Sequence, residues 1–208
     1  SPLFFTRPVN AATGSITLKD VSEGEINGTY KIMSANNINE CFDVENGTMM
    51  ENGVRILSYQ THTYSNQKFN FNFTRVDRDG NGNYIYTIST SYCDNYVLDI
   101  IGCSPDENVS LQLYEYNGTN AQKFMIKGAY VGEEIKGYVL LTGSSNYTKV
   151  LMNSNGCIVQ KSLNYNTLDL RQLWFFEQSF SSYAYKNSGY YDSDKQSGTF
   201  NAINYEND

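Results

Sequence analysis

An internal repeat that occurs three times dominates this sequence. Each copy opens on a glycine shortly before a tyrosine and ends in a Gln-x-aromatic triplet. The openings are Gly28-Thr29-Tyr30, Gly82-Asn83-Tyr84 and Gly137-Tyr138, spaced 54 and 55 residues apart. The ends are Gln67-Lys68-Phe69, Gln122-Lys123-Phe124 and Gln172-Leu173-Trp174, spaced 55 and 50 residues apart. One unit of this size cannot bury an apolar face alone, so we expect the copies to pack around a common axis.

A further marker recurs in the middle of each copy. It consists of two apolar residues followed by an acid or an amide: Cys41-Phe42-Asp43, Val97-Leu98-Asp99 and Leu151-Met152-Asn153, spaced 56 and 54 residues apart. The three kinds of marker therefore keep one order and nearly one period along the chain.

Short strands, rather than helices, are indicated within each copy. Apolar and polar residues alternate over 69–73, 84–88 and 109–113, which is the period of a half-buried strand. Asn-Gly and Asp-Gly pairs between such segments mark tight turns. No stretch of 10–12 residues shows the 3.6-residue period of a helix. We predict an all-β chain in which each copy supplies about four strands to a barrel and its cap.

The composition excludes several classes of function. The 208 residues include 15 Lys+Arg and 22 Asp+Glu, a formal net charge of −7, which argues against binding to nucleic acid or to anionic lipid. With 40% hydrophobic and 18% charged residues, the chain has the composition of a folded domain. No apolar run approaches the ~18 residues of a membrane helix, so we expect no membrane insertion.

The cysteines and the single histidine restrict the chemistry further. Four cysteines are compatible with two disulfides, and the spacing of Cys93 and Cys103 suits a bridge across a hairpin in an oxidising compartment. The sequence leaves open whether Cys41 and Cys157 meet. Without a Cys-x-x-Cys pair we expect no thiolate zinc site. His62 is the only histidine and lies outside any nucleophile motif, so we expect no catalytic residue, no metal and no cofactor.

The segment Asp77–Asn83 has some features of a calcium loop, since oxygen-bearing side chains alternate around Gly80. However, the twelfth position counted from Asp77 is Ile88, where a calcium loop needs a glutamate. We therefore predict a hairpin turn at this place.

Taken together, the markers resemble the ricin-B-type lectins, whose three copies end in a Gln-x-Trp triplet. The resemblance covers residues 28–178, with copies at about 28–81, 82–135 and 136–178. It implies a β-trefoil of three pseudo-repeats, with an N-terminal extension at 1–27 and a Tyr-rich C-terminal extension at 179–208. It also implies a secreted or cell-surface protein that binds glycans or glycoproteins, commonly of galactose type, and that serves as the targeting part of a toxin, an enzyme or another larger assembly.

The resemblance further implies a shallow sugar site in each copy, built from a middle-loop acid, an aromatic ring and an amide. The second copy matches this pattern best. Asp99 supplies the carboxylate, Tyr114 the ring and Asn117 the amide. Gln112 and Gln122 stand behind them. Two structural alternatives stay open, because the acid can tie backbone N–H groups of its loop and the glutamine amide can hold backbone groups under the barrel.

The first copy matches the pattern less well. It keeps the acid as Asp43, and Asn66-Gln67 resembles the amide pair that ends the family's repeats. Leu57 stands at the expected ring position, with Tyr59 two residues further on. We therefore rank this candidate sugar site second.

The third copy departs furthest from the pattern. Asn153 replaces the acid, Lys161 stands at the ring position and Arg171 precedes the closing glutamine, so we expect this copy not to bind. The loss of one site and the Tyr-rich tail favour an alternative function. In it the trefoil has lost sugar binding and acts as a protein-binding, inhibitory or surface-coat protein.

Overall fold

The computed structural model describes residues 14–21, 26, 28–45, 50–61 and 70–178. These residues form thirteen β-strands and four single 3-10 turns, without an α-helix among them, so the prediction of an all-β chain is confirmed. The strands are β1 (Thr17–Asp20), β2 (Gly28–Ser34), β3 (Glu40–Val44), β4 (Ile56–Gln60), β5 (Phe71–Arg78), β6 (Tyr84–Thr90), β7 (Cys93–Ile100), β8 (Val109–Glu115), β9 (Phe124–Val131), β10 (Glu134–Thr142), β11 (Lys149–Ser154), β12 (Cys157–Ser162) and β13 (Trp174–Gln178).

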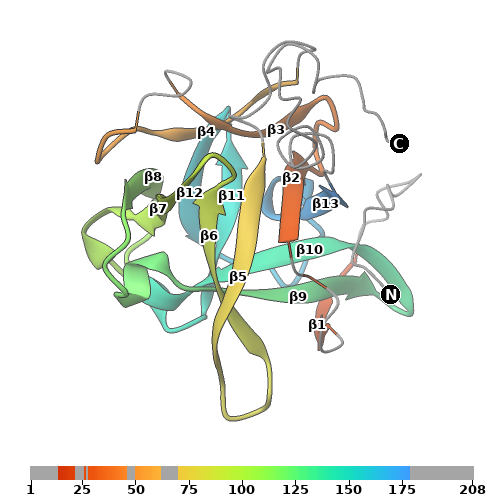
Figure 1. Cartoon of the computed structure of the whole chain (residues 1–208). Helices are drawn as coiled ribbons and strands as arrows, with labels where there is room; N and C mark the ends of the chain where they lie inside the picture. The colour runs from red at the N-terminus through yellow and green to blue at the C-terminus, as the bar shows by residue number, and fades with distance from the viewer. Residues whose placement is uncertain (1–13, 22–25, 27, 46–49, 62–69, 179–208) are drawn as a thin grey trace, which may run out of the picture.

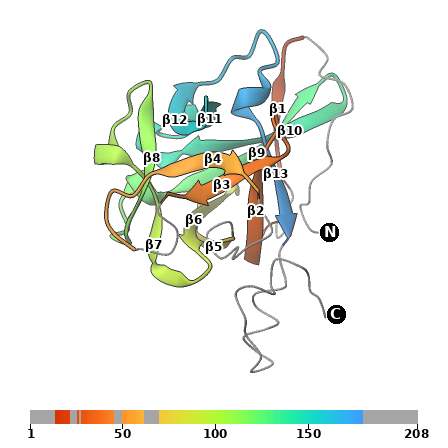
Figure 2. The same cartoon turned by 90° about the horizontal axis from the view of Figure 1, so that it is seen from above.

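Six of the strands pair edge to edge in a closed ring. The order around the ring is β2, β5, β6, β9, β10 and β13, and β13 pairs again with β2. Every strand of the ring has two neighbours, so the barrel has no free edge within it. The short strand β1 lies outside the ring against β9, where Thr17 pairs with Tyr130 (Figure 2).

Three hairpins, β3–β4, β7–β8 and β11–β12, lie outside this ring and contact one another (Figure 1). Strand β12 pairs with both β4 and β8, and an isolated bridge joins Arg55 to Gln112. The hairpins therefore form a cap on the barrel, as the expectation of a barrel and cap requires.

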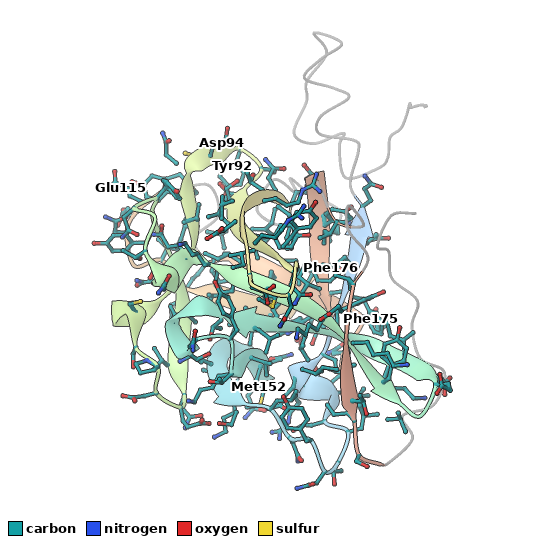
Figure 3. The ribbon with its side chains drawn as sticks, turned by 90° about the horizontal axis from the view of Figure 1, so that it is seen from below. Tyr92, Asp94, Glu115, Met152, Phe175 and Phe176 are labelled. Carbon is teal, nitrogen blue, oxygen red and sulfur yellow. The ribbon has the colours of Figure 1, made fainter. Side chains whose placement is uncertain are left out.

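The core fills the barrel and the space beneath the cap. Trp174 is fully buried, its ring centroid lies 4.7 Å from that of Phe42 at 89°, and its indole N–H donates to the Leu151 carbonyl at 3.0 Å. Phe175 and Phe176, labelled in Figure 3, are consecutive on β13 and pack into two different clusters. This follows from the period-2 alternation of strand side chains. The end-of-copy aromatics Phe124 and Trp174 are thus core residues, and Phe69 lies outside the described residues.

The β5–β6 hairpin extends away from the barrel (bottom of Figure 1) and turns at Asp79. The Asp79 carboxylate accepts from the backbone N–H groups of Asn81 and Asn83 at 2.9 and 2.8 Å and from the Asn83 amide at 3.0 Å. The hairpin turn predicted here is confirmed. Of these contacts, the Asn83 side chain contributes most to holding the pKa of Asp79 below its ordinary value.

Asp79→Ala should lower the free energy of unfolding by about 1 kcal/mol, because it removes the hydrogen bonds that stabilise this turn. The figure is small because the turn is exposed to solvent. A lowered pKa means that ionised Asp79 stabilises the fold above its ordinary pKa and that this contribution is lost as the pH falls through its folded-state pKa. Urea unfolding at neutral pH and at pH 3 checks both statements. If Asp79→Ala lowers the free energy of unfolding by the same amount at both pH values, the role of the ionised carboxylate is contradicted.

The cysteines correct one sequence prediction. All four are free thiols in this structure, and the Cys93–Cys103 bridge is not formed. Cys93 begins β7, an eight-residue strand, and Cys103 lies beyond its other end. At ~3.3 Å per residue the strand separates its ends by roughly 23 Å, whereas disulfide-bonded Cα atoms lie within ~7 Å. Cys41 is fully buried, and this burial raises the pKa of its thiol.

The described residues contain no helix long and apolar enough to cross a membrane. Residues 1–13, 22–25 and 27 of the predicted N-terminal extension and all of the predicted C-terminal extension, 179–208, lie outside the described residues.

Candidate functional site

Asp99 lies at the centre of the candidate site on the β7–β8 hairpin. The register places it opposite Gln112, whose amide donates to Asp99 Oδ1 at 3.0 Å, and the Gln122 amide donates to Asp99 Oδ2 at 2.9 Å. Only 4% of Asp99 is exposed, and this burial raises the pKa of its carboxyl against the opposing effect of the two amides. Because each carboxylate oxygen can accept two hydrogen bonds, Asp99 keeps acceptor capacity for a ligand.

A pocket of about 260 Å³ brings the predicted residues together. Asp99, Gln112, Tyr114 and Asn117 all line it. The sequence pattern did not assign the other four lining residues to the site: Gly102, Cys103, Thr119 and Ala121. Gly102 has a φ of +66°, which lets the β7–β8 loop curl at the pocket's edge.

Tyr114 and Asn117 supply the accessible groups of this pocket. Tyr114 is 36% exposed, so part of its ring is open to a ligand. Asn117 Oδ1 accepts from the Thr119 N–H at 3.0 Å and from the Thr119 hydroxyl at 2.8 Å. These bonds hold the amide in place and leave its Nδ2 donor unused within the described part of the chain. The pocket thus combines a charged acceptor, an aromatic surface and a neutral donor.

Gln122 holds the site from behind and does not line the pocket. It is fully buried, its Oε1 accepts from the Asn117 and Gly118 N–H groups at 2.8 and 3.2 Å, and its Nε2 also donates to the Glu115 carbonyl at 2.9 Å. Gln172 makes the same two kinds of backbone contact in its own loop. The structural alternative considered for this glutamine is therefore correct, with the addition that Gln122 positions Asp99.

Neither a protein-family model nor a curated protein matches this sequence. Solved structures do resemble it. The designed 3-fold symmetric protein ThreeFoil superposes with a TM-score of 0.58 at 20% identity, over 73% of this chain and 99% of that one. A Polyporus squamosus lectin, solved with the epitope Neu5Acα2-6Galβ1-4GlcNAc, gives 0.55 at 15% identity over 72% of this chain. The exo-β-1,3-galactanase 1,3Gal43A of Clostridium thermocellum gives 0.54 at 20% identity, also over 72%.

The fold is a β-trefoil. Identities of 20% and below show the fold alone, and they do not place the chain in the ricin-B-type family. The chain spans 48% of the Polyporus lectin and 30% of the galactanase, so what those whole proteins do does not transfer to this trefoil as a fact.

The first cap hairpin of the trefoil keeps the acid of this arrangement. Asp43 is 2% exposed and lies opposite Leu57, as Asp99 lies opposite Gln112. Tyr59, two residues on, therefore holds the position of the ring, and the sequence-based placement of Leu57 there was wrong. The loop of this hairpin is one residue longer than that of β7–β8, so Tyr59 follows Asp43 by 16 residues whereas Tyr114 follows Asp99 by 15. Asn66 and Gln67 lie outside the described residues.

The register also corrects the third hairpin of the trefoil. Asn153 pairs with Ile158, just as Ile100 pairs with Leu111, and both Ile158 and Leu111 pack in the main core cluster. Asn153 thus corresponds to a core-facing position, and the preceding residue, Met152, holds the place of the acid.

The third hairpin consequently lacks both the acid and the aromatic ring. Met152 replaces the carboxylate with a buried thioether (Figure 3), and Lys161, opposite Val150, stands where Tyr114 stands opposite Val97. A thioether is a poor acceptor for hydroxyl donors. The sequence predicted that this copy lacks the acid, and it does. The residue in the acid's place is Met152, however, and not Asn153.

Proposed function

We propose that this β-trefoil is a carbohydrate-binding protein that holds one sugar residue of a glycan in the Asp99 pocket. The convergence of a buried carboxylate, a partly exposed phenol ring and a free amide donor in one pocket carries this proposal. Galactose-type ends, as suggested by the resemblance, are the ligands we expect first. Glycans or glycoproteins outside the cell or on its surface would then be the partners.

The chemistry of each group matches one feature of a pyranose. Asp99 accepts hydrogen bonds from two adjacent hydroxyls, and such charge-assisted bonds contribute ~1.5–3 kcal/mol each when well formed. The Tyr114 ring packs on the apolar C–H face of the sugar. The Asn117 amide donates to a ring or hydroxyl oxygen and so contributes to the choice of epimer.

The three cap hairpins differ in how many of these groups they keep. We propose that the trefoil consists of three pseudo-repeats, that the second binds sugar, that the first binds more weakly through Asp43 and Tyr59, and that the third does not bind by this route. A single shallow site of this kind binds with a Kd near 1 mM, about −4 kcal/mol. Useful avidity then needs a second site or an attached partner.

Binding without hydrolysis is the form of this function that we propose. Glycoside hydrolysis ordinarily needs two carboxyl groups flanking the scissile bond. Among the described residues that line the Asp99 pocket, Asp99 is the only acid. Neighbours of the fold include a galactanase as well as lectins, and incubation with aryl galactosides checks that no sugar is released.

A glycan array, probed with the chain displayed multivalently, tests the proposal. We expect signal on a small set of glycans that share one terminal residue. An array without signal at high protein density would contradict sugar binding. It would favour the alternative of a protein-binding trefoil that has lost its ligand.

The pH dependence of binding should follow Asp99. Its pKa is raised above the ordinary 3.8, and only the ionised carboxylate accepts from two hydroxyls at once. Affinity should therefore fall as the pH drops through this raised pKa, which means at a higher pH than for an exposed aspartate. Isothermal titration with the best array ligand at a series of pH values measures this. Asp99→Asn should bind weakly with a flat profile, and an unchanged wild-type affinity down to pH 4 would contradict the assignment.

A further inference from the structure

A second pocket, of about 440 Å³, lies where the β3–β4 hairpin meets the turn of the β11–β12 hairpin. The two hairpins are joined there by the Ser58 N–H, which donates to the Gly156 carbonyl at 2.9 Å, and by the pairing of Cys157 with Leu57 (Figure 1). Glu40, Ser58, Tyr59, Asn153 and Arg171 are among its lining residues. This pocket is separate from the Asp99 pocket, because the lining residues of the two do not overlap.

The floor of this pocket is a connected hydrogen-bond network. Asn153 is 3% exposed, and its Nδ2 lies within reach of four acceptors at 3.0 to 3.3 Å: Ser34 Oγ, Asn36 Oδ1, Ser58 Oγ and Glu40 Oε1. The Ser34 hydroxyl donates to Asn36 Oδ1 at 2.7 Å, and the Ser58 hydroxyl donates to Glu40 Oε1 at 2.9 Å. Each of these oxygens can accept a second hydrogen bond, so acceptor capacity is left for hydroxyl donors from a ligand.

Asn153 occupies the hairpin position that Val44 and Ile100 occupy in the other two cap hairpins, where both are fully buried in the core. The amide has one structural role here, because its Oδ1 accepts from the Gly156 N–H at 2.8 Å and holds the β11–β12 turn. That contact does not involve Nδ2 or the hydroxyls and carboxylate around it, so these groups remain within reach of a ligand.

The rim supplies an aromatic surface and a donor whose charge is already balanced. Tyr59 is 53% exposed. Arg171 pairs with Asp169 through two bonds of 3.0 and 2.8 Å, which leaves Nη1 as a donor without a net positive charge at the site. Glu40, held by the Asn37 amide at 3.2 Å, is the one acid among the described residues that line the pocket. This charge pattern favours a neutral ligand over an anionic one.

From this geometry we propose that the pocket is a second sugar subsite, which takes a neutral pyranose through Glu40, the Asn153–Ser58 network and the Tyr59 ring. The inference rests on the proposed function and adds a site that the repeat pattern does not predict. Glu40 and Asp43 are three residues apart on β3, so they point to opposite faces of the strand. The two acids therefore serve different sites. Tyr59 pairs with Cys41 on the Asp43 face and also lines this pocket, so only one of the two sites can use its ring at a time. Two subsites on one chain, here and in the Asp99 pocket, would give it avidity.

Backbone amide shifts of ¹⁵N-labelled protein separate the two sites in one titration. The probes are the methyl glycosides of galactose, glucose, mannose and N-acetylgalactosamine, each added to 100 mM. The amides of Asn155 and Gly156 report on the second pocket, and those of Gly102 and Ala121 report on the Asp99 pocket. We expect at least one glycoside to move the Asn155 and Gly156 signals along a saturable curve.

Two variants and a control assign those shifts to the pocket. Tyr59→Ala and Glu40→Gln should each weaken the binding seen at Asn155 and Gly156 at least fivefold. Tyr165→Ala, a tyrosine of similar exposure (51%) outside both linings, should leave it unchanged.

The outcomes distinguish failure of the subsite from failure of the proposed function. Movement of the Gly102 and Ala121 signals alone would overturn the subsite and leave the Asp99 pocket as a sugar site. No movement at either pair with any probe would overturn both. Shifts at Asn155 and Gly156 that survive both Tyr59→Ala and Glu40→Gln would also overturn the subsite.

Discussion

Asp99→Ala should weaken sugar binding at the β7–β8 pocket by more than tenfold, which takes a millimolar interaction beyond detection. Among the described residues that line that pocket, this carboxylate is the one charged acceptor, and it is held in place by two amides at 3.0 and 2.9 Å. Removing it deletes the bonds to two hydroxyls together, and neither Tyr114 nor Asn117 can replace an acceptor of that kind.

The matched control for this change is Asp94→Ala. Asp94 is an exposed aspartate on the same strand, β7, and lies outside the Asp99 pocket. It should keep wild-type affinity, measured by titration calorimetry with the best array ligand. Asp99→Ala also leaves the Gln112 and Gln122 amides without their acceptor, which should lower the free energy of unfolding by ~1–3 kcal/mol. The thermal unfolding of the variant must therefore be recorded alongside its affinity. A folded Asp99→Ala protein with undiminished affinity would contradict the assignment of the site.

Trp174→Ala should lower the free energy of unfolding by ~3–5 kcal/mol, a large part of the stability of an ordinary domain. Trp174 is fully buried, packs edge-on against Phe42 at 4.7 Å and donates to the Leu151 carbonyl. The substitution leaves a cavity beneath the cap and a buried carbonyl without its donor.

Urea unfolding followed by circular dichroism measures this loss. Tyr165→Ala serves as the comparison, since an aromatic side chain that is 51% exposed should change stability by less than about 0.5 kcal/mol. A loss below 1 kcal/mol for Trp174→Ala would mean that the closing aromatic of the Gln-x-aromatic triplet does not support the junction of barrel and cap.

The fold could be predicted because its signals are local and repeated. Period-2 alternation, turn glycines and buried end-of-copy aromatics such as Phe124 and Trp174 each report on short segments, and their recurrence at one period specifies how the segments combine. The second-copy site could be predicted for the same reason. The register that sets Asp99 opposite Gln112 also brings Tyr114 to the same pocket.

The site residues of the first and third copies were misplaced because the loops of the three cap hairpins differ in length. Residues at equal spacing in the sequence therefore do not hold equal positions in the strand register. In the first hairpin the register puts the ring position at Tyr59, two residues beyond Leu57, and in the third hairpin it puts Met152 in place of Asn153. A one-residue slip exchanges the two faces of a strand, so counting cannot resolve it. The Glu40–Asn153 pocket could not be predicted either, because it joins side chains 113 residues apart across two hairpins.

The most direct test of the central claim is a crystal structure of the chain soaked in a mixture of monosaccharides at high concentration. We expect a pyranose in the Asp99 pocket, with two hydroxyls within hydrogen-bond distance of the carboxylate and its C–H face against the Tyr114 ring. An ordered pocket, open to the solvent channel and holding water alone at saturating sugar, would contradict the assignment of this trefoil as a carbohydrate-binding protein.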